Sequence, residues 1–413
     1  MTAFDTALVL GSAAAALTWA ALAAHVLTVQ HWRARAHAAV ANALAALASD
    51  EVRLLTVVER LARVRPLLAH ASREMIMRAA ADDETTPEMF DVWAEYLAST
   101  WGLDILEQDA AAHHNARDKW RRMTALRILG HLDHPRGIAL LARAVSESDE
   151  DVALVALAQL GQSNDPHAVR ILIDALVHQP HPAARVAAQL DRSPQYLAVH
   201  LQPLLGHADP VVRMWAATLL GRYPEVPGLE RELTTLADDA DPRVRKAAVQ
   251  SLGLVGDVEA TRAALRLLTD PVPFVRATAA RALGVLDRPE YAREVTTLLG
   301  DRDWWVRFAA KECLEMMGED IWPVLVRLLD SPDRFVRNGA AEVFQNLGLL
   351  DSFILMEAAS DGPAADKIDM LRRITVAGGV RLTDSLVERA GAAMGLRVRQ
   401  LLTTIGLEHV EAA

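Results

Sequence analysis

The residues of this 413-residue chain that could do chemistry do not form a recognised catalytic set. Its closely spaced histidines are His113 with His114, His131 with His134, and His178 with His181. We find no cysteine or acidic partner at metal-ligand spacing beside these pairs. We therefore interpret them as exposed or capping imidazoles, and we expect no metal and no cofactor.

Other signatures of catalysis or nucleic-acid binding are also missing. The chain contains no GxxxxGK[ST], HExxH or GxSxG motif. Its one cysteine, Cys313, falls where a helix needs a small apolar residue, which predicts a buried thiol. A net charge of −11 and the lack of a basic stripe argue against nucleic acid as a partner. We therefore expect a protein that is not an enzyme.

An aspartate and an arginine four residues apart do recur at a regular spacing. The segments DPVVRMWAATLLG (209–221) and DPRVRKAAVQSLG (241–253) are two copies of one motif. Alignment on the arginine gives steps of 28 to 32 residues through Arg122, Ala153 in the arginine's place, Arg185, Arg213, Arg245, Arg276, Arg307 and Arg337. A period held over this many copies predicts a helical repeat protein.

Each copy can be interpreted as a helix with its own start and stop. The aspartate is expected to cap the helix and the proline after it to occupy the first turn. Val, Ala-Ala and Leu then share one face, and the glycine is expected to end the helix in a left-handed conformation. Upstream lies a second apolar helix with a leucine pair, such as Leu267 and Leu268. Two such short helices cannot bury their apolar faces alone, so neighbouring repeats should stack.

This pattern resembles the HEAT-like repeats of the short class, about 30 residues long, named for phycobilin lyases. The resemblance implies an all-α, right-handed α-solenoid of stacked helix pairs over residues 116–350. The copy at Ala153 lacks the arginine, and the copy at Arg185 ends without its glycine. Residues 351–413 are interpreted as degenerate C-terminal repeats or a cap. Deoxyhypusine hydroxylase, an enzyme with such repeats, binds iron through His-Glu pairs; this chain has no His-Glu dipeptide, which excludes that enzyme.

The N-terminal segment 6–32 contains no Lys, Arg, Asp or Glu. A helix of about 23 apolar residues crosses a hydrocarbon core of about 30 Å. No basic residue precedes the segment, whereas Arg33 and Arg35 follow it. We expect one transmembrane helix in the inner (cytoplasmic) membrane, with the N-terminus outside and the repeats in the cytoplasm. A cleaved signal peptide and a buried soluble helix are the open alternatives.

Residues 33–115 are expected to form a helical stalk and an N-terminal cap for the solenoid. An acidic linker precedes Thr86 and Pro87, which should cap a helix that carries Phe90, Trp93 and Leu97.

The recurring charges suggest a ladder. Stacking should bring each motif arginine near the next repeat's aspartate, and the expected role is to set the repeat register. The expected ladder residues are Asp209, Arg213, Asp241, Arg245, Arg276, Asp303, Arg307, Asp333 and Arg337.

Positions −2 and +1 from the motif arginine share a helix face that repeats normally expose. Large and aromatic side chains gather there, which gives the candidate partner-binding residues Met214, Arg243, Lys246, Phe274, Trp305, Phe308 and Phe335. These side chains could form a recognition patch, be covered by the C-terminal segment or a dimer mate, or be exposed incidentally.

The sequence thus favours a membrane-tethered scaffold or adaptor that presents a concave repeat surface to an unidentified protein partner, with a homo-oligomer as a further possibility. The alternatives are an accessory or lyase-like subunit of an enzyme, such as a phycobilin-lyase-related activity, and a partner of an envelope glycosyltransferase.

Overall fold

A computed structural model describes residues 26–28, 30–31, 34–49, 55–69, 71–82, 85–111, 116–178, 181–192, 197–256, 258–360, 364–378 and 391–405. These residues form helices and turns, and none of them lies in a strand. The chain divides into two compact units, Met1–Leu197 and Ala198–Ala413, which we describe separately. The expected transmembrane segment, 6–32, lies almost wholly outside the described residues. Within the described part, no helix combines the length and the apolar character that membrane crossing requires.

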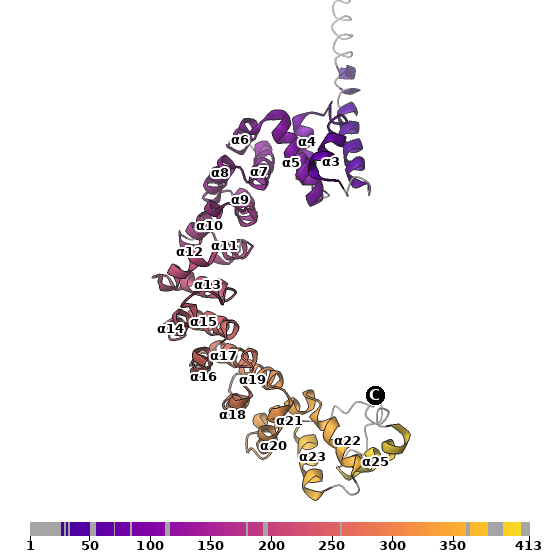
Figure 1. Ribbon diagram of the computed structural model, residues 1–413, viewed down its shortest axis with the longest axis vertical. Coiled ribbons are helices and arrows are strands. Elements are labelled where there is room, and N and C mark those ends of the chain that lie inside the picture. Colours follow the sequence, from indigo (N-terminus) through magenta and orange to yellow (C-terminus); the bar gives the residue numbers. More distant parts are fainter. Residues whose placement is uncertain are drawn as a thin grey trace, which may run out of the picture. The chain divides into compact units, whose positions relative to one another are not determined.

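The first unit is a succession of antiparallel helices (Figure 1). Residues 26–28, 30–31 and 34–48 are helical. The helices that follow are α3 (Val57–Val64), α4 (Arg73–Ala81), α5 (Pro87–Trp101), α6 (Leu103–Ala111), α7 (Ala116–His131), α8 (Pro135–Val145), α9 (Glu150–Gln162), α10 (Pro166–His178) and α11 (Ala183–Leu190). As predicted, Thr86 caps α5 and Pro87 begins it, and Trp93 and Leu97 are fully buried.

The second unit begins with short helices and continues as helix pairs. Its elements are α12 (Leu197–Leu201), η1 (Gln202–Gly206), α13 (Pro210–Leu220), α14 (Leu229–Leu236), α15 (Pro242–Val255), α16 (Val258–Leu267), α17 (Pro273–Val285), η2 (Pro289–Tyr291), α18 (Ala292–Thr296), η3 (Thr297–Gly300), α19 (Trp304–Met316), η4 (Glu319–Ile321), α20 (Trp322–Leu328), α21 (Arg334–Asn346), α22 (Leu349–Ala359), α23 (Ala365–Gly378) and α25 (Gly391–Thr404).

The motif helices of this unit stack on one another. Helices α13, α15, α17, α19 and α21 form one row, and α14, α16, α18 and α20 form the other (Figure 1). The motif valines fill the core between the rows: Val244, Val275 and Val306 are fully buried. The alanine pairs and leucine columns are buried in the same way, as the periodicity predicts. The all-α repeat solenoid is therefore confirmed for the described repeats.

The motif aspartates begin the helices as expected. Asp209, Asp241, Asp303 and Asp333 each cap a helix by accepting the backbone N–H two residues further on, at 2.7 to 2.8 Å. Each cap satisfies a donor that has no partner inside the helix.

The motif glycines do not adopt the expected left-handed conformation. Gly221 has a right-handed φ of −56°, and Gly253 lies inside α15. Their hydrogen atoms face the next stacked helix instead: a Cβ on Gly253 would lie 3.1 Å from the Cβ of Ala282. The left-handed residue comes later, as at Gly256, where φ is 65°. Gly221 does end α13 as its C-cap, but the predicted left-handed conformation was wrong, because these glycines allow close helix packing.

Candidate interaction surface

Three motif arginines of the second unit join neighbouring repeats through paired hydrogen bonds. The Nε and Nη2 atoms of each arginine donate to one carboxylate of the following repeat. The Nε–O distances are 2.8 Å from Arg213 to Asp239, 2.7 Å from Arg245 to Asp270 and 2.8 Å from Arg276 to Asp301. The remaining nitrogen, Nη1, donates to carbonyls before its own helix. Each guanidinium therefore fixes two successive turns, as a planar fork of five donors can.

The acidic partner differs from the one expected. Arg213 pairs with Asp239, which lies two residues before the cap Asp241. The carboxylate of Asp241 is occupied by its own helix, because it accepts the Arg243 N–H at 2.8 Å. Asp239 Oδ1 in turn accepts the Asp241 N–H at 2.8 Å. Capping and arginine binding are thus divided between two aspartates, and the predicted pairing with the cap residue was wrong.

These ladder carboxylates are shielded and strongly hydrogen-bonded. Burial acts to raise the pKa of Asp239, but the hydrogen bonds from Arg213 and the Asp241 N–H outweigh it, so the pKa falls below its ordinary value of 3.8. The pKa of Asp301 is lowered in the same way, because the bonds from Arg276 and the Asp303 N–H outweigh its burial. The charged form of each carboxylate is therefore the one that stabilises the fold.

The ladder changes at Arg307. In the repeat after Arg307, Ser331 lies two residues before the cap Asp333. This is the position that Asp301 has before the cap Asp303, in the repeat after Arg276. Arg307 Nη1 still donates to the carbonyls of Asp301 and Arg302, at 2.8 and 3.3 Å. Within the described residues, however, no carboxylate forms an ion pair with Arg307. Its Cζ lies instead over the ring of Phe335, 4.4 Å from the centroid.

Aromatic side chains are exposed on the same helices, as the −2 and +1 columns indicated. Phe274 on α17, Trp305 and Phe308 on α19, and Phe335 on α21 remain 39 to 43% exposed. Trp304, which the sequence analysis did not select, is 62% exposed. We call these five residues the aromatic face. Trp304 could have been found because it directly precedes Trp305 and so lies one residue before the −2 position of its repeat.

Ring packing holds part of this face together. Trp305 stacks on Phe308 with centroids 5.6 Å apart, and Trp304 meets Trp305 edge-on at 5.0 Å. The Arg281 guanidinium lies 5.1 Å above the Trp305 ring. Rings held in this way lose little conformational freedom on binding, which favours contact with a partner.

A second line of charges runs between the helices that carry these rings. Arg281 Nε lies 2.8 Å from Glu312, and Lys311 Nζ lies 2.7 Å from Glu342. We did not predict these pairs, although the residues recur 31 positions apart. This regular spacing is the signal that could have revealed them.

A groove opens between α19 and α21 beside the aromatic face. It has a volume of about 220 Å³, and its lining includes Trp304, Arg307, Phe308, Lys311 and Phe335. Its walls thus combine exposed rings with two basic groups and one carboxylate, that of Glu342, which is paired with Lys311. We call it the aromatic groove.

The remaining partner candidates lie on earlier helices and form no aromatic cluster. Met214 on α13 is half-buried. Arg243 on α15 binds its own cap residue, with Nη2 2.7 Å from Asp241. Lys246 is exposed.

The other residues with reactive groups have structural surroundings. His131 lies 2.9 Å from Asp91, and His178 Nδ1 lies 2.8 Å from the carbonyl of Asp174 in its own helix. The pair His113 and His114 lies outside the described residues. Cys313 is fully buried as predicted, and burial raises the pKa of its thiol to about 12.

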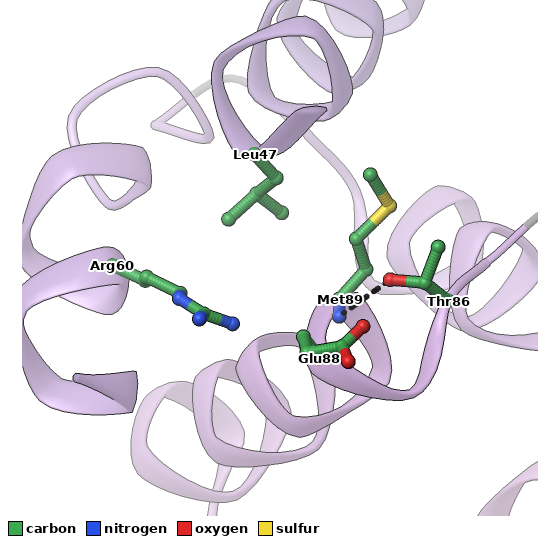
Figure 2. Close-up of a pocket in the computed structure, with 5 residues that line it drawn as sticks. All are labelled: Leu47, Arg60, Thr86, Glu88 and Met89. Carbon is green, nitrogen blue, oxygen red and sulfur yellow. Dashed lines mark hydrogen bonds between the residues drawn. The ribbon is translucent and has the colours of Figure 1, made fainter. Parts of the chain in front are cut away.

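A hollow in the first unit has a different character. Figure 2 shows five of its lining residues, Leu47, Arg60, Thr86, Glu88 and Met89, around a space of about 360 Å³. Thr86 is committed to the cap of α5, where its Oγ1 accepts the Met89 N–H at 3.4 Å. We interpret this hollow as a gap between packed helices.

Comparison with known protein families agrees with the repeat architecture. HEAT repeats match residues 110–190, 198–284 and 262–345, which together make up more than half of the chain. The chain belongs to the HEAT-repeat family. The matched repeats include all the helices of the arginine ladder and the aromatic face.

Comparison with solved structures also gives matches, among them Kap95p, a phycocyanin lyase complex and human deoxyhypusine hydroxylase. Kap95p, solved with RanGDP, is 12% identical over 89% of this chain and 59% of its own, with a TM-score of 0.47. The phycocyanin lyase complex of Nostoc is 20% identical over 65% of this chain and 94% of its own, with a TM-score of 0.27. Human deoxyhypusine hydroxylase is 19% identical over 60% of this chain and 96% of its own, with a TM-score of 0.26. No function follows from likeness at this level. No curated protein matches the sequence of this chain.

Proposed function

We propose that this HEAT-repeat protein is a scaffold or adaptor that binds a protein partner through its aromatic face. The observation that carries the proposal is the exposure of Phe274, Trp305, Phe308 and Phe335 along three stacked helices. Soluble proteins seldom expose several large apolar side chains together, and aromatic side chains are enriched at binding hot spots. The face provides apolar contact area and basic groups, and we assign it no reaction.

The scaffold is further proposed to be tethered to the inner membrane, with its repeats in the cytoplasm. This part of the proposal rests on the uncharged segment 6–32 and on Arg33 and Arg35 behind it. A tether would hold the aromatic face near a partner at the membrane and raise the local concentration of one for the other.

Affinity capture from detergent-solubilised membranes tests the binding surface. The wild-type chain is compared with a Trp305→Ala/Phe308→Ala variant, and captured proteins are identified by mass spectrometry. Loss of a hot spot costs at least about 2 kcal/mol, so the partner should be depleted roughly thirtyfold.

Trp322→Ala is the matched control, because Trp322 on α20 is 39% exposed but lies in the other helix row. This variant should capture the same partner as the wild type. Equal capture by all three proteins would contradict the proposed surface. Retention of a stoichiometric metal or small ligand on purification would favour an accessory or lyase-like subunit instead.

A further inference from the structure

The fold contains a repeated carboxylate receptor. At three successive junctions, a motif arginine holds an aspartate of the next repeat with Nε and Nη2, and that aspartate also accepts a backbone N–H at 2.8 Å. At the middle junction, Arg245 binds Asp270, whose side chain is only 3% exposed. The guanidinium fork is therefore shaped and oriented for a coplanar carboxylate.

The same receptor recurs at Arg307 without its carboxylate. Arg307 Nη1 donates to the carbonyls of Asp301 and Arg302, just as Arg276 Nη1 donates to those of Asp270 and Pro271 one repeat earlier. Ser331 Oγ accepts the Asp333 N–H at 3.3 Å, just as Asp301 Oδ1 accepts the Asp303 N–H one repeat earlier. The Ser331 side chain is too short to reach the fork, so Nε and Nη2 of Arg307 have no carboxylate partner among the described residues.

This arginine also lines the aromatic groove. Arg337, in the last motif copy, likewise donates to two carbonyls, but it lies outside the groove lining. The exposed Arg334 lies beside the groove, with its Cζ 4.9 Å from the centroid of the Phe335 ring. Lys311, by contrast, is paired with Glu342 at 2.7 Å. Among the charged residues that line the groove, Arg307 is therefore the one without an ion-pair partner in the described part of the chain.

We propose that Arg307 receives an aspartate or glutamate side chain of the protein partner, which completes the carboxylate ladder in trans. An apolar side chain next to this carboxylate would pack against Phe308 and Phe335 in the aromatic groove. The proposal rests on the proposed function and specifies its recognition chemistry, a short acidic segment with a neighbouring large apolar residue. Complementary charge would fix the orientation of that segment more than its total affinity.

Two substitutions at one position test this assignment. Ser331→Asp should supply the missing carboxylate from within the chain, fill the Arg307 fork and exclude the partner. Ser331→Asn is the matched control, because its side chain has nearly the same shape but carries no charge. The Asp variant should also unfold at a higher urea concentration than the Asn variant, since it gains an ion pair that the preceding junctions already have.

The binding probe is a set of 12-residue peptides selected on the immobilised wild-type chain from a random phage-displayed library. Synthetic peptides then have each Asp or Glu replaced by Asn or Gln, or the C-terminus amidated. We expect at least tenfold weaker binding to Ser331→Asp than to Ser331→Asn, with a similar loss when one peptide side-chain carboxylate is neutralised.

Several outcomes would overturn the assignment. Equal binding by the two Ser331 variants would do so, and so would loss of binding on C-terminal amidation alone. If Trp305→Ala/Phe308→Ala abolishes peptide binding but Ser331→Asp does not, the aromatic face remains a binding surface and only the role of Arg307 is wrong. If no peptide is enriched, both the role of Arg307 and the aromatic face as a binding surface are rejected. A wild-type dimer that Trp305→Ala/Phe308→Ala converts to monomer would assign the groove to a second copy of this chain.

Discussion

At the scale of single residues, the repeat separates two tasks that one aspartate could have combined. Asp241 caps its helix, whereas Asp239 receives the arginine of the preceding repeat. This division lets each carboxylate keep good geometry with its own donors. The stability of each junction should therefore depend on the ladder pair more than on exposed pairs nearby.

Arg245→Ala should lower the free energy of unfolding by about 2 to 3 kcal/mol. The change leaves the carboxylate of Asp270, which is 3% exposed, without its cation and removes donors from the carbonyls of Asp239 and Ala240. Urea unfolding monitored by circular dichroism measures the loss. Arg243→Ala serves as the control, because Arg243 is 54% exposed and water screens its ion pair, so the loss should be much smaller. Equal losses from both variants would contradict a structural ladder.

The ladder also predicts how stability depends on pH. The folded-state pKa values of Asp239 and Asp301 lie below 3.8, so each carboxylate stabilises the fold fully above that value. Stability should hold from pH 7 to about 5 and fall as the pH drops through 3.8 toward the lowered values. An Asp239→Asn/Asp301→Asn variant, less stable at pH 7, should show a shallower decline in urea midpoint on acidification. A decline as steep as that of the wild type would refute this role.

At the scale of helices, the local part of the fold could be predicted from the sequence. Helix starts at Asp209 and Asp241 follow from residues adjacent in the chain. The partner of Arg213 could not be predicted, because stacking decides whether Asp239 or Asp241 faces it. Exposure of Trp305 and Phe308 follows from helical periodicity, whereas the missing carboxylate at Arg307 becomes apparent only once the partners of the other arginines are known.

The close approach of motif helices gives a prediction at this scale. Gly253→Leu should cost about 1 to 3 kcal/mol, because a Cβ there would lie 3.1 Å from that of Ala282 on α17 and force the helices apart. Gly206→Leu is the control, since its Cβ would meet no atom within 4 Å. Thermal unfolding should show a lower midpoint for the first variant alone. Unchanged midpoints in both would mean that the helices can separate without cost.

At the scale of the whole molecule, the proposed tether fixes which compartment the repeats face. Protease added to intact spheroplasts should leave peptides containing Arg213 uncut, because the inner membrane would shield them. The same protease should cleave them after detergent lysis, which serves as the control. Cleavage at this site in intact spheroplasts would place the repeats outside and reject the cytoplasmic assignment.

Site-specific photo-crosslinking in intact cells tests the central claim most directly, namely that the aromatic face contacts another protein. Benzoylphenylalanine is placed at Phe308 in one variant and at Trp322 in another, two side chains that are each 39% exposed but lie in different helix rows. We predict a discrete covalent adduct with a second protein from position 308 and none from position 322. No adduct at 308, or the same adduct from both positions, would contradict the account.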